Sequence, residues 1–473
     1  MIFKKMLGSS KELNRLWVTG SKLCLPFMLV ILFVSSGFMS KVHAGEVKSA
    51  YVHLARGMPA LLHEPVESGP KSKTGILILH PSADVLLKPT WAEQLAKRGY
   101  RVLSANSAYN HVGMTSDYDW DELLLQVSKA VAYLRNQPGI EKVILWGNSG
   151  GGAMMSAYQN IASNGLVACQ GPEKIIKCSD SLADLPAADG LILFDPMFGY
   201  GPAVLMNLDP AIIDEDNPQK LNPKLDMFDP KNGYKADGST KYSDEFMGRY
   251  FAGQKKRMDK LIANALDRLE KIEAGKGNYL DDEPFVVPGG AFLSLKLPAT
   301  DIRLWSGTRN AYPLLRADSS ITTEVIKSVR ALNPPTSSAT PKLMRNAGGS
   351  ALNTTVRRFL STFATRSSKH YGYDADTITG IDWSSSYNSL PGSLEGVKEP
   401  VLIVGMTGFF LVSGIELAYE HTSSADKTLV YVEGGDHHGE PCKQCEKPAI
   451  EYGDTVKHTF DYIDAWLSKA KRF

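Results

Sequence analysis

The residues Gly147-Asn148-Ser149-Gly150-Gly151 follow the spacing G-x-S-x-G, which places a serine among small residues. The apolar run at residues 142–146 predicts a buried strand before this motif, and residues 153–163 predict a helix after it. A serine in a tight turn between strand and helix is strained, and its hydroxyl is exposed at the positive end of the helix. Ser149 is therefore a candidate nucleophile. A dinucleotide fingerprint is disfavoured, because Ser149 stands where that motif has its middle glycine.

Further elements must position this turn. Strand and helix signals alternate along the chain, and the strands are apolar throughout rather than on one face only. This pattern predicts an α/β fold with a mostly parallel, doubly wound sheet that helices cover on both faces. The expected strands are residues 75–80, 100–104, 142–146, 190–194, 401–404 and 428–432, and the expected helices are residues 91–98, 119–136, 153–163 and 454–471.

A long stretch between the fourth and fifth of these strands breaks the alternation. A strong helical pattern covers residues 244–273, and two shorter helices are expected near residues 322–332 and 353–365. A Pro-Pro-Thr-Ser-Ser linker at residues 334–338 separates the two shorter helices. Connections this long are usually domains or lids, so we expect a largely helical inserted cap.

The order of these elements around the serine motif resembles the α/β-hydrolase superfamily, over roughly residues 48–200 and 395–473. The resemblance implies a core in two parts, residues 45–196 and 396–473, with the cap at residues 197–395. It also implies that Ser149 is the nucleophile. The loop at residues 80–83, His-Pro-Ser-Ala, is similar to the superfamily's oxyanion segment. Because Pro81 has no N–H, the expected oxyanion donors are the backbone N–H groups of Ser82 and Gly150.

The same resemblance implies a histidine after the last strand and a carboxylate that orients it. Counting from Gly434 in a G-x-x-H pattern gives His437 as the base, with its neighbour His438 as the fallback. Residues 405–411, where the superfamily usually has its acid, contain no carboxylate. Asp195 and Glu416 are the replacements, and we favour Asp195 because the end of a strand orients a side chain rigidly.

The N-terminal residues 1–44 have the features of an export signal. They contain six Lys and Arg residues and one acid, an uncharged run at residues 23–40, and the sequence Val-His-Ala at residues 42–44. This pattern predicts a signal peptide that is cleaved near Ala44 and a protein exported to the periplasm or the medium, with no membrane span after cleavage. The alternative is an uncleaved N-terminal anchor.

The cysteines agree with export. The four that follow residue 44 predict two disulfides in an oxidising compartment, most simply Cys169–Cys178 and Cys442–Cys445. Two alternatives remain for the second pair: a redox-active C-x-x-C motif, or a zinc site that also uses His437 and His438. We expect neither a metal nor a cofactor.

The composition is that of an ordinary globular protein, with 43% hydrophobic and 22% charged residues. The formal net charge of +1 gives no support to a nucleic-acid partner. The sequence therefore predicts an exported serine hydrolase that cleaves a small or lipid-like carboxylic ester through an acyl-enzyme. The alternatives are hydrolysis of a lactone, amide or carbon–carbon bond, or an inactive binding protein of the same fold. Aromatic residues that either line an apolar substrate pocket or belong to the core are Trp305, Tyr312, Tyr371, Tyr373, Phe409 and Phe410.

Overall fold

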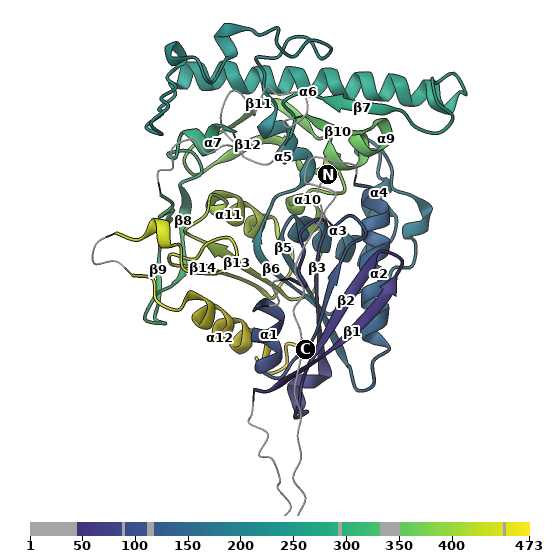
Figure 1. The fold of residues 1–473 in the computed structure, drawn as a ribbon, viewed down its shortest axis with the longest axis vertical. Coiled ribbons are helices and arrows are strands. Elements are labelled where there is room, and N and C mark those ends of the chain that lie inside the picture. The colour runs from purple at the N-terminus through teal and green to yellow at the C-terminus, as the bar shows by residue number, and fades with distance from the viewer. Residues whose placement is uncertain (1–44, 88–89, 111–117, 292–295, 332–350, 448–450) are drawn as a thin grey trace, which may run out of the picture. The chain divides into compact units, whose positions relative to one another are not determined.

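The computed structural model describes residues 45–87, 90–110, 118–291, 296–331, 351–447 and 451–473 (Figure 1). The predicted signal peptide and the predicted linker at residues 334–338 lie outside these ranges, so the cleavage near Ala44 stays a prediction. Within the described ranges, no helix combines the length and the apolar character that crossing a membrane requires.

One sheet of ten strands forms the centre of the fold, in the order β1-β2-β4-β3-β5-β6-β13-β14-β8-β9. Neighbours from β4 through β8 in this order run parallel, whereas β2 is antiparallel to β1 and β4, and β9 is antiparallel to β8. The predicted mostly parallel sheet is confirmed. The strands are β1 (Val47–Ala55), β2 (Met58–Pro65), β3 (Thr74–His80), β4 (Arg101–Asn106), β5 (Lys142–Ser149), β6 (Gly190–Pro196), β8 (Gly307–Leu315), β9 (Ile321–Lys327), β13 (Val401–Met406) and β14 (Lys427–Val432).

Helices cover both faces of the sheet because successive strand residues point to opposite sides. In β3, Ile76 and Ile78 belong to the core under α1 (Thr90–Lys97) and α12 (Thr455–Leu467). The residues between and after them, Leu77 and Leu79, belong to the larger core on the other face. Helices on that second face are α2 (Trp120–Arg135), α3 (Gly150–Asn164), the short α4 (Val167–Gln170) and α11 (Val412–His421).

The inserted stretch is dominated by α6 (Asp244–Glu273), whose bounds match the predicted helix (Figure 1). Ser243 caps its first turn by accepting a hydrogen bond from the N–H of Phe246. Two small antiparallel sheets of two strands each, β7 with β10 and β11 with β12, complete this region, and the second of them packs against α6. The remaining elements are α5 (Tyr200–Asn207), β7 (Pro284–Val287), α7 (Lys296–Thr300), β10 (Leu352–Thr355), α9 (Val356–Arg358), β11 (Arg366–Tyr373), β12 (Ile378–Asp382) and α10 (Leu390–Leu394).

Two expectations about the insertion were wrong. The helix expected near residues 322–332 is strand β9, because Ile321, Thr322, Thr323, Val325 and Ile326 are β-branched and favour a pleated surface. The region near residues 353–365 is only partly helical, since β10 precedes α9 and a turn of π-helix at Phe359–Phe363. Because β8 pairs with β14 and β9 pairs with β8, part of the stretch at residues 197–395 extends the core sheet instead of forming a helical cap.

A buried arginine attaches α6 to the loops around it. The guanidinium of Arg257 forms two hydrogen bonds with Glu215, at 2.9 and 2.5 Å. It also donates to the carbonyls of Asp209 (2.8 Å) and Pro288 (2.7 Å). Its side chain is only 5% exposed, so solvent screens this pair weakly.

Replacing this arginine should destabilise the protein. Arg257→Met leaves the Glu215 carboxylate and two carbonyls without their donor, and we expect a loss of about 3–5 kcal/mol in the free energy of unfolding. Arg249→Met is the matched control, because Arg249 lies on the same helix and forms an exposed pair with Glu245. Urea unfolding measures both variants. Equal losses would contradict the anchoring role of Arg257.

Candidate active site

Ser149 lies at the turn where β5 ends and α3 begins, as the sequence predicted. Its backbone has a φ of 52° and a ψ of −124°, which is a strained conformation for a residue with a side chain. Strand and helix approach closely at this turn, since a Cβ added at Gly147 of β5 would collide with the backbone of Gly151 in α3. The backbone therefore presents the Ser149 side chain at the carboxyl end of the sheet, above the first turn of α3.

The favoured acid, Asp195, lies beside this turn. It is near the end of β6, the strand that pairs with β5, and the register sets Ser149 opposite Pro196. The Ser149 carbonyl also accepts a hydrogen bond from the N–H of Met197 at 2.9 Å. Asp195 is fully buried and has a positive φ of 44°, so it too is in a strained conformation fixed by its surroundings.

The predicted base, His437, meets this acid. Its Nδ1 lies 2.5 Å from Oδ2 of Asp195, although the two residues are 242 positions apart. An ionised carboxylate can only accept, so Nδ1 donates and Nε2 is the nitrogen that can take up a proton. The Phe409 ring stacks on the imidazole with centroids 4.1 Å apart. Carboxylate and aromatic ring together fix the orientation of the imidazole.

Asn148 connects the serine turn to the histidine loop, a role that the sequence analysis missed. Its Nδ2 donates to the carbonyl of His437 at 3.2 Å and to the carbonyl of Phe194 at 3.0 Å. Asn148, which directly precedes Ser149, therefore holds the backbone of His437, the residue that contacts Asp195. The only signal in the sequence was a polar residue at a variable position of the motif, which is too weak to assign this contact.

Burial and hydrogen bonding act in opposite directions on the acid. Desolvation raises the pKa of the Asp195 carboxyl, while hydrogen bonds from His437 and from the N–H of Met406 lower it. Both donors stabilise the charged form of a carboxylate that has no access to water. The arrangement lets Asp195 hold the imidazole while remaining an acceptor.

The fallback base has a different environment. The N–H of His438 donates to Oδ1 of Asp436, and its carbonyl accepts from Nε1 of Trp91 at 2.9 Å. Its ring is stacked on the Trp91 ring of α1, with centroids 6.1 Å apart. Of the two neighbouring histidines, His437 is the one that contacts a candidate acid.

The fallback acid, Glu416, is 1% exposed and lies on α11. Its two oxygens accept from the backbone N–H groups of Arg309 (2.9 Å) and Asn310 (3.0 Å), near the start of β8. Because both carboxylate oxygens accept these bonds, Glu416 holds β8 against α11. Among the two acids considered from the sequence, only Asp195 reaches His437.

The predicted oxyanion loop differs from the expectation. The N–H of Ser82, proposed as an oxyanion donor, donates instead to Nδ1 of His80 at 3.1 Å, and the N–H of Ala83 donates to the same atom at 2.7 Å. The physical reason is that burial lowers the pKa of His80 to about 3 and keeps its ring neutral, so Nδ1 accepts both bonds. Gly150 is the first residue of α3, and its role as an oxyanion donor stays a prediction.

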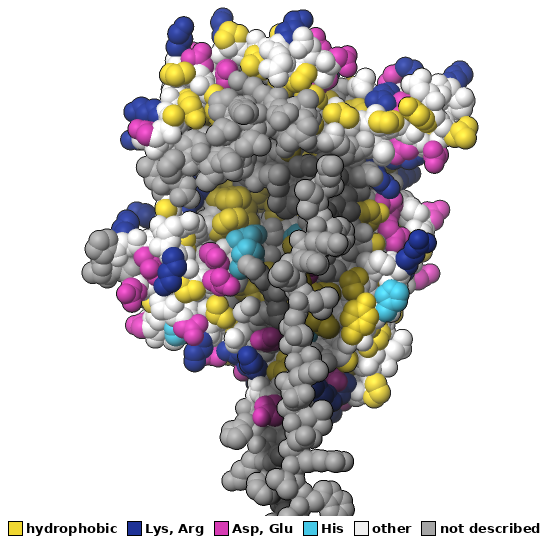
Figure 2. Space-filling view, viewed as in Figure 1, with side chains coloured by type: hydrophobic (Ala, Val, Ile, Leu, Met, Phe, Trp, Pro, Cys, Tyr) yellow, Lys and Arg dark blue, Asp and Glu magenta, His cyan; other side chains and the backbone are white. Residues whose placement is uncertain are grey.

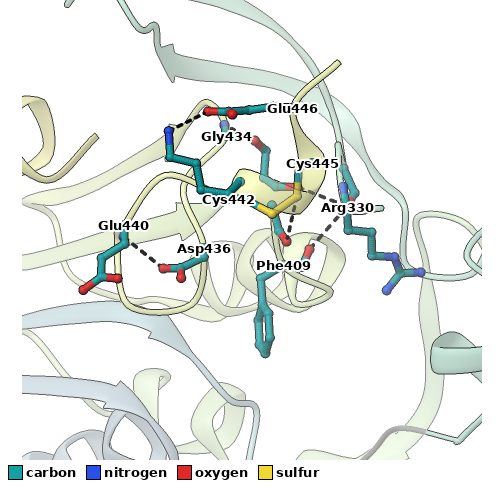
Figure 3. The surroundings of a disulfide bond; sticks show 12 residues. Arg330, Phe409, Gly434, Asp436, Glu440, Cys442, Cys445 and Glu446 are labelled. Atoms are coloured by element: carbon teal, nitrogen blue, oxygen red, sulfur yellow. Dashed lines mark hydrogen bonds and ion pairs between the residues drawn. A yellow bond between two sulfur atoms is a disulfide. The ribbon is translucent and has the colours of Figure 1, made fainter. Parts of the chain in front are cut away.

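Both predicted disulfides, Cys169–Cys178 and Cys442–Cys445, are present. The second one braces the loop that carries His437 (Figure 3). The N–H of Cys442 donates to the carbonyl of Gly434 at 2.8 Å, and the N–H of Gly408, next to Phe409, donates to the carbonyl of Gly435 at 2.9 Å. Both cysteines are 3% exposed, which does not suit a redox-active pair.

The disulfide also leaves no thiolates for the considered zinc site. Elsewhere in the described parts of the chain, no group of three or more His, Cys, Asp and Glu residues could hold a metal ion. On the face shown in Figure 2, basic and acidic side chains are interspersed, in agreement with the balanced net charge.

Most of the aromatic residues considered for a substrate pocket belong to the core. Trp305 is fully buried, and Tyr371 and Tyr373 pack with Phe251 of α6, with the Tyr373 and Phe251 centroids 4.6 Å apart. Tyr312 packs against Tyr419 and Tyr431 near the sheet edge. By contrast, Phe409 and Phe410 are half-buried and lie at the histidine loop.

The strand order, the strained serine turn after β5 and the histidine loop after β14 define an α/β-hydrolase fold. Comparison with solved structures finds brefeldin A esterase, a bacterial homologue of human hormone-sensitive lipase, at 12% identity and a TM-score of 0.38, covering 89% of this chain and 76% of the esterase. A soluble variant of monoglyceride lipase from Saccharomyces cerevisiae has 13% identity and a TM-score of 0.37, covering 90% of this chain and 95% of that one. Est1E from Butyrivibrio proteoclasticus has 12% identity and a TM-score of 0.35, covering 89% and 97%. No protein-family model matches the sequence, and neither does any curated protein.

The buried imidazole of His80 predicts a pH dependence of stability. The unfolded chain takes up a proton on this residue below about pH 6.5, whereas the folded protein does so only near pH 3. Acid therefore favours the unfolded state between these values, by up to about 1.4 kcal/mol for each pH unit. We expect the free energy of unfolding to fall less steeply from pH 7 to pH 4 in His80→Asn than in the wild type.

The control for this measurement is His370→Asn, which replaces an exposed histidine on β11 and should keep the wild-type pH dependence. Urea unfolding at intervals between pH 7 and pH 4 gives the three curves. A His80→Asn curve parallel to that of the wild type would show that the proton uptake of His80 does not contribute.

Proposed function

We propose that this protein is a serine hydrolase that cleaves carboxylic esters through an acyl-enzyme intermediate. The observation that carries the proposal is the 2.5 Å contact between Nδ1 of His437 and Oδ2 of the buried Asp195, beside the strained turn of Ser149. The hydrogen bond from Asn148 to the His437 carbonyl supports it, because it ties the base to the strand that carries the serine. Serine, histidine and carboxylate in this relation can perform acyl transfer.

In the first half of the proposed reaction, Oγ of Ser149 attacks the ester carbonyl while Nε2 of His437 takes up the hydroxyl proton. The carbonyl oxygen becomes negatively charged and accepts the N–H of Gly150, at the positive end of α3. When the tetrahedral intermediate collapses, the bond to the leaving alcohol breaks and His437 returns the proton to that oxygen. Water then attacks the acyl-enzyme by the same route and releases the acid and the free serine.

Asp195 acts on this cycle through His437. Its carboxylate fixes the Nδ1–H tautomer, so that Nε2 carries the lone pair that faces the reaction. It also stabilises the imidazolium that forms after proton transfer. The lack of a carboxylate at residues 405–411, together with the large insertion, was the reason to consider an inactive binding protein, and the contact of Asp195 with His437 supports the catalytic alternative.

The proposed substrate is a small or lipid-like carboxylic ester. Export into an oxidising compartment is part of the proposal, supported by the pattern of residues 1–44 and by the two disulfides. No step in the proposed reaction requires a metal or a cofactor.

The decisive experiment combines a fluorophosphonate probe with a panel of acyl-chain and aryl esters. We expect the probe to label the wild type at Ser149 and the protein to hydrolyse at least one ester of the panel. Ser149→Ala should lose the label and lower turnover by about 10⁴-fold or more, while its circular dichroism spectrum is unchanged. A wild type that neither reacts with the probe nor cleaves any ester would overturn the proposal, and so would full activity in Ser149→Ala.

A second prediction separates the two candidate acids. Asp195→Asn should lower kcat by about 10⁴-fold, because an amide in this position favours the wrong tautomer of His437. Glu416→Gln should keep kcat within about threefold, but it should cost roughly 1–3 kcal/mol of stability, because it weakens the acceptors for Arg309 and Asn310. Steady-state kinetics and urea unfolding of both variants give the answer. The reverse pattern of kcat would assign the role to Glu416.

A further inference from the structure

The site described above has one backbone donor for an oxyanion, the N–H of Gly150, where hydrolases of this kind use two or more. The two N–H groups that follow Pro81 both donate to Nδ1 of His80, so the loop after β3 directs them towards its own imidazole. Among the residues that the structure describes, a second donor would therefore come from another part of the fold. The groups closest to Gly150 are the ones to consider.

The side chain that lies against Gly150 is Tyr200. A Cβ added at Gly150 would collide with the hydroxyl of Tyr200, while the ring atoms Cζ and Cε2 would lie 3.0 and 3.3 Å from it. The hydroxyl end of the tyrosine is therefore the part that touches the residue after the nucleophile. Tyr200 is the first residue of α5 and follows Asp195 by five positions, so one short segment carries both groups to the serine turn.

The surroundings hold this ring in one place. Tyr200 is 2% exposed, and its ring makes edge contacts with Tyr118 (centroids 5.6 Å apart), Trp120 (5.5 Å) and Phe363 (6.3 Å). Burial raises the pKa of the Tyr200 hydroxyl well above its usual value, so it stays protonated and can donate a hydrogen bond at any pH of interest. A neutral, fixed hydroxyl next to Gly150, the residue after the nucleophile, has the properties of an oxyanion donor.

We propose that the hydroxyl of Tyr200 is the second oxyanion donor of this site, acting together with the N–H of Gly150. The inference rests on the proposed function. In the tetrahedral intermediate the tyrosine donates its hydrogen bond to the negatively charged oxygen and keeps its proton throughout, so no bond to Tyr200 forms or breaks. Glycine at position 150 is required because any larger residue would displace this hydroxyl.

The test is Tyr200→Phe, assayed with an ester that the wild type cleaves. We expect kcat to fall by about 10²–10³-fold with KM changed by less than about threefold, because the lost hydrogen bond forms only in the transition state. Binding of a trifluoromethyl ketone, which forms a tetrahedral adduct with the serine, should weaken by a similar factor. Tyr158→Phe is the matched control, since it removes an equally buried hydroxyl on α3 that donates to the carbonyl of Pro186. It should keep the wild-type kcat.

A second variant distinguishes the loss of the oxyanion donor from misfolding of Tyr200→Phe. Gly150→Ala keeps the backbone N–H and the tyrosine but forces the hydroxyl away, so it should lower kcat in the same way. Wild-type kcat and inhibitor binding in Tyr200→Phe would overturn the role of Tyr200. If Tyr200→Phe behaves as the wild type but Ser149→Ala is inactive in the same assay, only the role of Tyr200 is overturned and the proposed function stands. Full activity in Ser149→Ala would instead overturn the proposed function, and the oxyanion role with it.

Discussion

The buried hydrogen bond between Asp195 and His437 is the interaction on which the rest of this site depends. It joins residues 242 positions apart, and it forms in a place with no solvent to compete for the carboxylate. An isolated charge there would be costly, and the donors from His437 and from the N–H of Met406 offset that cost. The neighbouring features either hold these two side chains or fix the backbone of the serine turn beside them.

Three constraints converge on the pair. The parallel pairing of β5 with β6 fixes Asp195 beside Ser149. The hydrogen bond from Asn148 fixes the backbone of His437 relative to β5. The Cys442–Cys445 disulfide and the Phe409 ring both restrain the histidine loop (Figure 3). The strained backbone at Ser149 and Asp195 persists because these contacts determine it from several directions.

The sequence allowed the prediction of features that depend on local patterns. The G-x-S-x-G turn, the parallel sheet and α6 follow from glycine spacing and hydrophobic periodicity, and Asp195 follows from its place at a strand end. Features that depend on contacts between residues far apart in the chain could not be predicted from the sequence. Strand β9 has an ambiguous local pattern and is decided by its pairing with β8. The N–H of Ser82 was misassigned because its partner, the neutral ring of His80, depends on burial that only the folded chain creates.

A crystal structure of the protein after reaction with a fluorophosphonate would show whether Ser149, His437 and Asp195 act together. We expect phosphorus bonded to Oγ of Ser149, Nε2 of His437 within hydrogen-bonding distance of the adduct, and Nδ1 still bonded to Asp195. An unmodified Ser149, or an adduct with the His437 ring turned away from Asp195, would contradict this expectation.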